Sequence, residues 1–275
     1  MRAAVVGHVE WIEFAQVSRV PLPGEIVHAD HTFQVAAGGG AVAAMQLAKL
    51  AGEATLYTAL GNDEVGQRCE RELTDLGLRV SAVYREEAQR RGFVFLDSQG
   101  ERTITVLGQR LGPAGRDTLP WDELDETVAV YLTAGDVEAV RRARKAGVLV
   151  STARGLETLS DAGVELDALV SSGSDPGERY AGDLVPPPRY VVRTAGGDGG
   201  EWESSAGESG RWQAEPLPGP VKDSYGCGDS FAAGLTYGLG CGWPIEEALQ
   251  LAARCGAACL TGRGPYEVQL TLARQ

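Results

Sequence analysis

The chain has 275 residues, 43% of them hydrophobic and 23% charged, a balance typical of globular proteins that excludes extensive disorder. Its 38 acidic residues outnumber its 25 basic ones, and the resulting net charge of −13 argues against binding to a nucleic-acid backbone. A small anionic ligand is not excluded, because a helix N-terminus can bind phosphate even in an acidic protein. Glycine occurs 37 times, about twice its average share, so glycine-rich turns are a prominent feature of the chain.

No segment of the sequence predicts secretion or a membrane span. The apolar stretch near the N-terminus is too short for a signal-peptide core and ends at Glu10. The uncharged run 36–45 is roughly half as long as a helix that crosses a bilayer. The five cysteines include no Cys-x-x-Cys pair, which indicates neither a disulfide framework nor a zinc ribbon. We therefore predict a cytoplasmic protein.

Short apolar runs alternate with helical patterns along most of the chain. Strands are predicted at 3–6, 32–35, 55–60, 92–96, 103–106, 129–132, 148–150, 167–170 and 190–193. Helices are predicted at 41–50, 64–76, 229–239 and 245–260, with a further one that ends near 146. This alternation predicts an α/β fold with a central, mainly parallel sheet flanked by helices. The strand 32–35 and the hairpin 92–106 do not fit that scheme and predict a separate small sheet.

The clearest functional pattern is the stretch from Asp223 to Asp229, which reads Asp-Ser-Tyr-Gly-Cys-Gly-Asp and opens a predicted helix. Gly226 and Gly228 let the backbone approach a ligand closely, and the helix start directs free N–H groups and its positive dipole end into that turn. Such a turn suits a phosphoryl group. Asp229 either caps the helix or takes a proton from a hydroxyl group that then attacks the phosphoryl group.

This stretch, which continues as Ser-Phe-Ala-Ala-Gly, resembles the C-terminal signature of the PfkB/ribokinase family of carbohydrate kinases. Four further segments match motifs of that family, so the resemblance extends over essentially the whole chain: Pro23-Gly24-Glu25, Gly38-Gly39, Gly100-Glu101-Arg102 and Thr194-Ala195-Gly196-Gly197-Asp198-Gly199. The resemblance implies a ribokinase-like fold. It also implies one kinase domain over 1–275, with a small β-sheet lid built from about 10–37 and 90–108 inserted in it.

The resemblance further implies roles for individual residues. Asp229 matches the catalytic base, and the Gly38-Gly39 turn lies under the substrate. The backbone N–H groups that match the anion hole for the transferring phosphoryl group are those of Gly226, Cys227 and Gly228. The residues implied along the phosphates and ribose of ATP are Thr194, Gly196, Gly199 and Gly228. The implied ligands are ATP, Mg²⁺ and a sugar or sugar-like acceptor.

Two departures from the family pattern concern the acceptor. Ile12 stands where family members commonly carry an Asp that binds sugar hydroxyls, and Ala43 stands where they carry an Asn. Glu10 and Glu13 flank Ile12. One of them could replace the missing carboxylate, or both could simply be exposed acidic residues. We predict Glu10 as a substrate ligand. Because a buried polar ligand needs partners, the pocket is expected to hold something other than ribose in the usual pose, or to hold it with different residues.

A third departure concerns metal ions. The family's Asn-x-x-Glu motif, which influences Mg²⁺ and the phosphates, has no counterpart directly after residues 169–170. Asp175-Pro176-Gly177-Glu178 offers the same spacing, so Asp175 and Glu178 are predicted to act on Mg²⁺, often through water. Asp223 lies where many family members help to bind a monovalent cation such as K⁺. Cys227 replaces a residue that is usually alanine, and we interpret it as a small residue rather than a reactive thiolate.

We therefore predict an ATP-dependent phosphotransferase that phosphorylates a hydroxyl group of a sugar or sugar-like molecule. The alternatives are a nucleoside kinase of the same family and a non-catalytic sugar or nucleotide sensor on the same fold. A dinucleotide-dependent oxidoreductase is disfavoured, because the first strand is followed by Gly7-His8-Val9-Glu10 and not by Gly-x-Gly-x-x-Gly. The exposed edges of the lid strands predict that two subunits can pair there as a homodimer. No nucleic-acid or membrane partner is expected.

Overall fold

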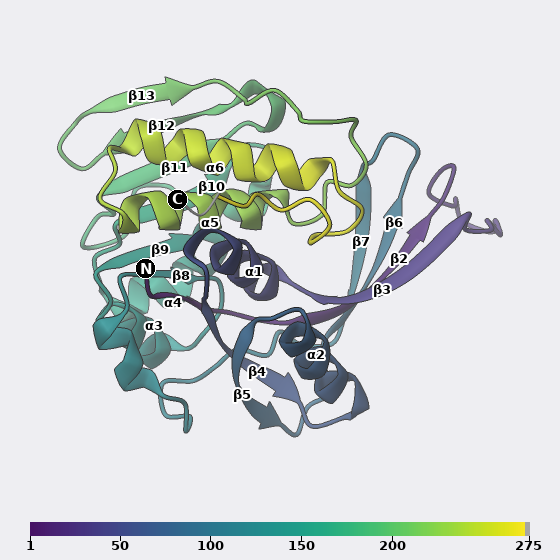
Figure 1. The fold of residues 1–275 in the computed structure, drawn as a ribbon, viewed down its shortest axis with the longest axis horizontal. Coiled ribbons are helices and arrows are strands. Elements are labelled where there is room, and N and C mark those ends of the chain that lie inside the picture. The colour runs from purple at the N-terminus through teal and green to yellow at the C-terminus, as the bar shows by residue number, and fades with distance from the viewer. Residues whose placement is uncertain (273–275) are drawn as a thin grey trace.

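Nine strands form the central sheet of the protein, which we describe from a computed structural model covering residues 1–272 (Figure 1). Their order is β13-β12-β11-β10-β9-β8-β1-β4-β5. The strands listed from β11 to β5 run parallel, and only β12 runs in the opposite direction, pairing antiparallel with both β11 and β13. This confirms the predicted mainly parallel sheet. The bounds are β1 (Ala3–Val6), β4 (Thr55–Gly61), β5 (Arg79–Arg85), β8 (Ala129–Leu132), β9 (Val148–Thr152), β10 (Ala168–Ser172), β11 (Tyr190–Thr194), β12 (Gly200–Ser204) and β13 (Ser209–Trp212).

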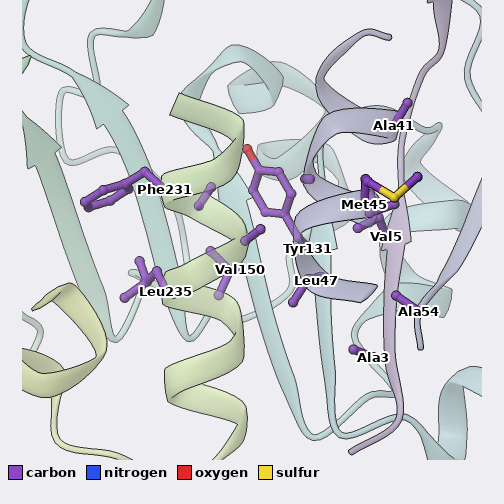
Figure 2. Close-up of a cluster of buried hydrophobic side chains, with 14 of the residues drawn as sticks. Ala3, Val5, Ala41, Met45, Leu47, Ala54, Tyr131, Val150, Phe231 and Leu235 are labelled. Carbon is purple, nitrogen blue, oxygen red and sulfur yellow. The ribbon is translucent and has the colours of Figure 1, made fainter. Parts of the chain in front are cut away.

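Helices cover both faces of this sheet. Strand β1, which lies within the sheet, is therefore apolar at every position. Ala3 and Val5 belong to the cluster formed with α1, α2, α5 and α6, whereas Ala4 and Val6 belong to the cluster formed with α3 and α4. Figure 2 shows the first cluster, where side chains of α1 and α5 meet those of the central strands. Because successive strand residues face opposite sides, a strand covered on both faces needs apolar residues at every position. The helices are α1 (Gly39–Ala51), α2 (Glu64–Asp75), α3 (Val137–Ala143), α4 (Leu156–Ala162), α5 (Cys227–Gly240) and α6 (Ile245–Leu260).

The second sheet has four strands in the order β3-β2-β6-β7 and lies beside the large sheet, at the right in Figure 1. β2 and β6 run parallel, and the other two pairings are antiparallel. Ile12, Phe14 and Val94 are fully buried on one face, where they pack with Val42 of α1 and with Tyr225. This arrangement confirms the predicted small sheet. Its strands, which we call the lid sheet, are β2 (Glu10–Gln16), β3 (His31–Ala37), β6 (Arg91–Leu96) and β7 (Arg102–Leu107).

Three strands at or next to the edges of the large sheet were not predicted, namely β5, β12 and β13. Their sequences are less apolar because edge strands are only partly covered. In β12, for example, Trp202 is buried between the exposed residues Glu201 and Glu203. In the lid sheet, β3 and β7 are edge strands and every residue of β7 is exposed, so pairing of two subunits there stays a prediction. Within residues 1–272, no helix combines the length and hydropathy of a membrane-spanning segment. The domain predicted over 1–275 includes three residues, 273–275, that lie outside the described residues.

Candidate active site

Several polar residues meet at the carboxyl ends of the parallel strands. His8 follows β1, Thr133 follows β8, Arg154 follows β9, and Thr194 ends β11. Parallel strands present their carboxyl ends at one edge of the sheet, so these residues lie along a single edge. This is the edge at which open α/β sheets bind their ligands.

The glycine-rich turn before α5 is the N-terminus of that helix, because α5 begins at Cys227. Gly226 has φ +84°, and a Cβ atom there would lie 2.9 Å from Cγ1 of Val42, so the turn requires glycine. Within residues 1–272, no hydrogen bond uses the N–H groups of Gly226, Cys227 or Gly228. Gly228 is exposed, and open space surrounds its Cβ position. The turn therefore offers an anion free N–H groups and the positive end of the helix dipole, as the predicted anion hole requires.

The carboxylate of Asp229 lies against the Gly38-Gly39 turn. A Cβ atom on Gly39 would lie 2.7 Å from Oδ1 of Asp229 and 3.3 Å from Cε1 of His8. Glycine at this first position of α1 thus leaves room for both side chains. The predicted base and the predicted substrate turn are neighbours, although 190 positions separate them in the sequence (229 − 39).

His8 is a neutral member of this cluster. Burial, followed by the charges of Arg110 and Arg90, lowers the pKa of His8 well below its usual value. The N–H of Gly39 donates to Nε2 of His8 at 3.4 Å, so the ring proton resides on Nδ1, which lies 3.3 Å from the hydroxyl of Thr133. The imidazole therefore connects the substrate turn to the loop that follows β8.

The lid sheet reaches the anion-binding turn through Arg102, the first residue of β7. Its guanidinium donates to the carbonyl oxygen of Ser224 and lies 5.9 Å over the ring centroid of Tyr225. The N–H of Ser224 in turn donates to the carbonyl of Gly100 (3.2 Å). The motif Gly100-Glu101-Arg102 lies in the predicted lid, but its sequence does not indicate that Arg102 contacts the site, because nothing local to the motif shows what the hairpin packs against.

The carboxyl group of Asp229 has a raised pKa. Burial raises the pKa of its carboxyl from 3.8 to about 6; the charges of Arg102 and Arg154 oppose this shift, and those of Glu178 and Glu10 add to it. A carboxylate with such a pKa is ionised at neutral pH and is a stronger base than an ordinary aspartate. Proton transfer is most efficient when the pKa of the catalytic group lies near the working pH.

We expect the rate of the reaction to fall in acid because only the ionised form of Asp229 accepts a proton. The value of kcat/KM should decrease about tenfold per pH unit below a midpoint near pH 6. Arg102 lowers this pKa, so Arg102→Met should move the midpoint to higher pH. The pH profile of kcat/KM measures both effects, with Arg91→Met on the exposed side of β6 as the control. A midpoint near pH 4, or one that Arg102→Met leaves in place, would contradict this assignment.

Of the two carboxylates that flank Ile12, Glu10 is the one at the site. Its side chain is buried, its Cγ lies 3.2 Å from the Cβ position of Gly38, and its Oε1 lies 2.7 Å from Nε of Arg90. Glu13 points to the opposite face of β2, because successive side chains of a strand alternate between its two faces and Glu13 is three residues after Glu10. Glu10 as a substrate ligand stays a prediction, and it would act together with Arg90.

The predicted nucleotide loop joins β11 to β12 at the same edge of the sheet. Gly199 has φ +82°, and a Cβ atom there would lie 2.1 Å from the carbonyl oxygen of Trp212, so this position requires glycine. The hydroxyl of Thr194 donates to the carbonyl of Ser171 at 3.3 Å, which fixes the start of the loop. No atom lies within 4 Å of the Cβ position of Gly196. The loop thus has a rigid base and open space above it, and its contact with ATP stays a prediction.

Most of the chain matches a known protein family. The family model described as pfkB family carbohydrate kinase matches residues 2–146 and 165–271. The chain belongs to this family. The ATP-dependent ribose-1-phosphate kinase of Halopiger xanaduensis is 31% identical to it over 94% of this chain and 91% of that protein.

Solved structures confirm the ribokinase-like fold. A putative ribokinase from Agrobacterium tumefaciens superposes with a TM-score of 0.81 at 20% identity, covering 98% of this chain and 94% of that chain. The ribokinase of Arabidopsis thaliana in complex with ribose and ATP superposes with a TM-score of 0.76 at 20% identity, and the superposition covers 97% of this chain and 95% of that chain. The membership inferred from the Gly-Cys-Gly-Asp stretch is therefore confirmed.

In this kinase, the two predicted Mg²⁺ residues both contact Arg154. Asp175 accepts the N–H of Gly177 at 2.8 Å with one oxygen and pairs with Arg154 through the other, so both oxygens are engaged. Glu178 lies 2.7 Å from Nε of Arg154 and close enough to Asp229 to influence its pKa. In the described residues, no group of three His, Cys, Asp or Glu side chains could hold a metal by itself. Because waters and ATP phosphates supply most ligands of Mg²⁺, Glu178 fits a water-mediated role, and Asp175 fits it poorly.

The carboxylate of Asp223 has a clear structural task. Its Oδ1 accepts the N–H of Tyr225 at 2.8 Å and its Oδ2 accepts the N–H of Gly264 at 3.0 Å. These bonds fix the turn before α5 to the segment that follows α6. The role of Asp223 at a monovalent cation stays a prediction.

Cys227 behaves as a small neutral residue in this kinase. Hydrogen bonding with Cys259 and burial raise the pKa of the Cys227 thiol well above its usual value, so it carries no charge at neutral pH. We expect Cys227→Ala to keep kcat within about threefold of the original value, since the backbone N–H that serves the anion hole is retained. Steady-state kinetics measures this. A much larger loss would assign the thiol itself a part in the reaction.

Proposed function

We propose that this kinase transfers the γ-phosphoryl group of ATP to a hydroxyl group of a sugar or sugar-like acceptor. The observation that carries the proposal is the position of Asp229. Asp229 belongs to the first turn of α5, whose N–H groups are free, its carboxylate lies against the Gly38-Gly39 turn, and its pKa is raised to about 6. A hydroxyl group beside Gly39 would therefore meet a base on one side and an anion-binding turn on the other.

The chemistry follows from this arrangement. Asp229 takes the proton of the acceptor hydroxyl as its oxygen bonds to the γ-phosphorus; the bond from that phosphorus to the bridging oxygen breaks, and ADP leaves. The N–H groups of Gly226, Cys227 and Gly228 stabilise the charge on the transferring group. Mg²⁺, when bound, neutralises charge on the phosphates, and Glu178 is the side chain that would hold it through water. The lid sheet excludes water, which would otherwise compete as acceptor.

The nucleotide is placed by the loop after β11. Thr194 and Gly199 fix the two ends of this loop, Gly196 and Gly197 border open space between them, and backbone N–H groups suit the polyphosphate of ATP. A non-catalytic sensor on the same fold has no need of a half-buried carboxylate with a raised pKa beside an anion-binding turn, since its negative charge opposes the binding of phosphate. Asp229 therefore favours the kinase over the sensor.

Acceptor-dependent release of ADP tests the proposal. The protein is incubated with Mg²⁺, ATP and one candidate at a time from a panel of pentoses, hexoses, nucleosides and sugar phosphates. We expect at least one sugar compound to stimulate ADP release well above the rate of ATP hydrolysis in water alone. Binding of ATP, measured by calorimetry, without stimulation by any acceptor of the panel would instead favour the sensor. A response to nucleosides alone would favour a nucleoside kinase.

A further inference from the structure

Tyr131 differs from the other buried tyrosines in the use of its hydroxyl group. The residue is 3% exposed and lies on β8, in the apolar cluster that the central strands form with α1 and α5. The hydroxyl of Tyr57 donates to the carbonyl of Pro120 at 3.3 Å, and that of Tyr225 accepts the N–H of Gly38 at 3.1 Å. Within residues 1–272, the hydroxyl of Tyr131 forms no hydrogen bond. Because an unpaired buried polar group costs free energy, such an exception requires an explanation.

The hydroxyl oxygen of Tyr131 borders open space. It is not among the fully enclosed side-chain polar atoms that lack a partner in residues 1–272, so the small exposed part of the residue includes this oxygen. In Figure 2 the ring lies between α1 and α5, and its hydroxyl points towards the ends of these helices that carry Ala41 and Phe231. These are the N-terminal ends, which begin at Gly39 and Cys227. The hydroxyl is thus directed at the candidate active site from the side of the sheet.

Charged groups of the site act on this hydroxyl. Burial, followed by the charges of Asp229 and Glu178, raises the pKa of Tyr131 well above its usual value, and the charge of Arg154 opposes the shift. The hydroxyl therefore keeps its proton at neutral pH and is available as a hydrogen-bond donor. Among these three charges Asp229 has the largest effect, which indicates that the donor lies near the predicted base.

The place of Tyr131 in the sheet favours the acceptor over the nucleotide as its ligand. Tyr131 pairs with Val5 of β1, the strand that leads into His8, and α1 on the same face begins at the Gly38-Gly39 turn. The loop predicted to bind ATP follows β11, which is three strands away from β8 in the sheet. Three strand spacings correspond to about 14 Å. The donor is therefore on the acceptor side of the site.

We propose that the hydroxyl of Tyr131 binds the acceptor, donating a hydrogen bond to one hydroxyl oxygen of the sugar while the reacting hydroxyl faces Asp229. This inference rests on the proposed kinase function. Ile12 and Ala43 stand where family members carry two polar side chains for the acceptor, so its hydroxyl groups need partners elsewhere. Tyr131 supplies one from a strand of the central sheet, where a side chain is held more precisely than on a loop. The unpaired donor gains its partner when the acceptor binds.

Tyr131→Phe removes only this oxygen. We expect the KM of the best acceptor from the panel above to rise about tenfold, since one neutral hydrogen bond contributes a factor of this size. The KM of ATP should be unchanged. The Tm should be equal to that of the original protein or higher, because the hydroxyl has no partner in the free protein. Steady-state kinetics and thermal unfolding measure these quantities, and a lower Tm with unchanged kinetics would assign Tyr131 a purely structural role.

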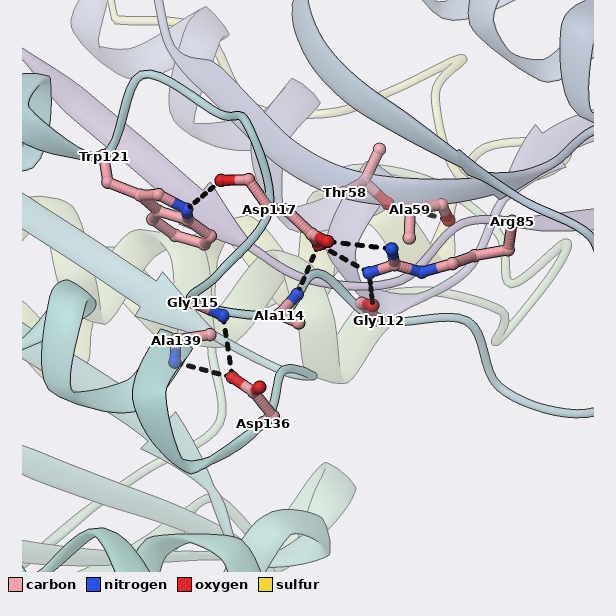
Figure 3. A network of polar contacts seen from close by, with 10 residues as sticks. All are labelled: Thr58, Ala59, Arg85, Gly112, Ala114, Gly115, Asp117, Trp121, Asp136 and Ala139. Atoms are coloured by element: carbon pink, nitrogen blue, oxygen red, sulfur yellow. Dashed lines mark hydrogen bonds and ion pairs between the residues drawn. The ribbon is translucent and has the colours of Figure 1, made fainter.

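Tyr57→Phe is the matched control. Tyr57 is buried on β4, and its ring stacks on Trp121, whose Nε1 donates to the carbonyl of Asp117 at 3.1 Å (Figure 3). Since the hydroxyl of Tyr57 is hydrogen-bonded to Pro120, its removal should lower the Tm. Both KM values should stay unchanged, because Tyr57 belongs to the cluster on the opposite face of the sheet from Tyr131.

Deoxy analogues identify the oxygen that Tyr131 binds. The value of kcat/KM is measured for the best acceptor and for deoxy compounds that each lack one of its hydroxyl groups. We expect Tyr131→Phe to reduce the preference for the acceptor over one of these analogues about tenfold and to leave the other preferences unchanged. An equal loss with every compound, no loss at all, or a rise in the KM of ATP instead would overturn the proposal and leave the kinase function in place.

Binding measured without turnover separates the two proposals. Asp229→Asn should be stabilised against heat by the best acceptor, and the double variant with Tyr131→Phe should be stabilised less. If no compound of the panel supports release of ADP but one of them stabilises the protein in this Tyr131-dependent way, the kinase function fails and the binding role of Tyr131 stands. If acceptors are phosphorylated but stabilise the protein equally with and without the hydroxyl of Tyr131, the binding role fails.

Discussion

Asp229→Asn should lower kcat by about 10²- to 10⁴-fold, the usual contribution of a positioned general base. The amide has the shape of the carboxylate but cannot accept the hydroxyl proton. Affinity for ATP should be equal or higher, because the substitution removes a negative charge beside the anion-binding turn. Steady-state kinetics and calorimetric titration with ATP measure the two quantities.

The control for this variant is Asp122→Asn. Asp122 is an exposed residue of the short 3-10 helix Trp121–Glu126, which is not part of the glycine-rich motif. It should change neither kcat nor ATP affinity. Unchanged turnover in Asp229→Asn would remove Asp229 from the mechanism. A parallel loss of turnover and of ATP affinity would instead indicate that the turn before α5 had collapsed.

Asp229→Asn should also stabilise the protein at neutral pH. Burial raises the pKa of the Asp229 carboxyl in the folded protein to about 6. Folding therefore favours the protonated carboxyl, and the ionised carboxylate lowers the stability of the folded protein above that pH. A shift of roughly two units corresponds to at most about 3 kcal/mol. The Tm of Asp229→Asn should therefore exceed that of the original protein by the largest amount above pH 6. The difference should shrink between pH 6 and about pH 4 and disappear below about pH 4. Activity and stability would then oppose each other at one residue, as expected for a functional site.

Gly39→Ala should reduce kcat/KM by about 10²-fold or more. The added Cβ atom would lie 2.7 Å from Oδ1 of Asp229 and 3.3 Å from Cε1 of His8, so the carboxylate has to move. A displacement of about 1 Å in a reacting group is enough for a loss of this size. Gly39 is the first residue of α1 and has no positive φ, so alanine is compatible with the backbone and the helix should form normally.

Gly219→Ala is the matched control, since the nearest atom to its Cβ position, Cβ of Thr261, is at an ordinary 3.7 Å. Both variants should unfold at temperatures close to that of the original protein, and only Gly39→Ala should lose activity. Full activity of Gly39→Ala would mean that the base works in a position other than the one described. A large fall in Tm would attribute the loss to folding.

The edges of the two sheets illustrate where pattern reading fails. The central strands were predicted because a strand covered on both faces is a continuous apolar run, as in β1 and β8. β12 was missed because Trp202 is its single buried residue, and a lone tryptophan between two glutamates has no strand periodicity that can be recognised. β5 was missed for a similar reason, as it begins and ends with arginine at the opposite edge.

The sequence by itself determined the features that are local in the chain. The Gly-Cys-Gly-Asp turn needs only adjacent residues to place Asp229 at a helix start with free N–H groups, and the alternation of elements is enough to indicate a mainly parallel sheet. For the same reason the family resemblance could be read from short motifs.

Only the tertiary structure decided what depends on contacts between distant segments. The pleat of β2 and its packing on α1 bring Glu10 to the site and turn Glu13 away. Arg110 and Arg154 come from two segments 44 positions apart (154 − 110), and no motif marks either of them. Both line one cavity because the loop after β7 of the lid sheet reaches the carboxyl edge of the large sheet, where β9 ends. Local sequence fixes backbone conformation, whereas a site built from several segments is assembled only when the strands pair.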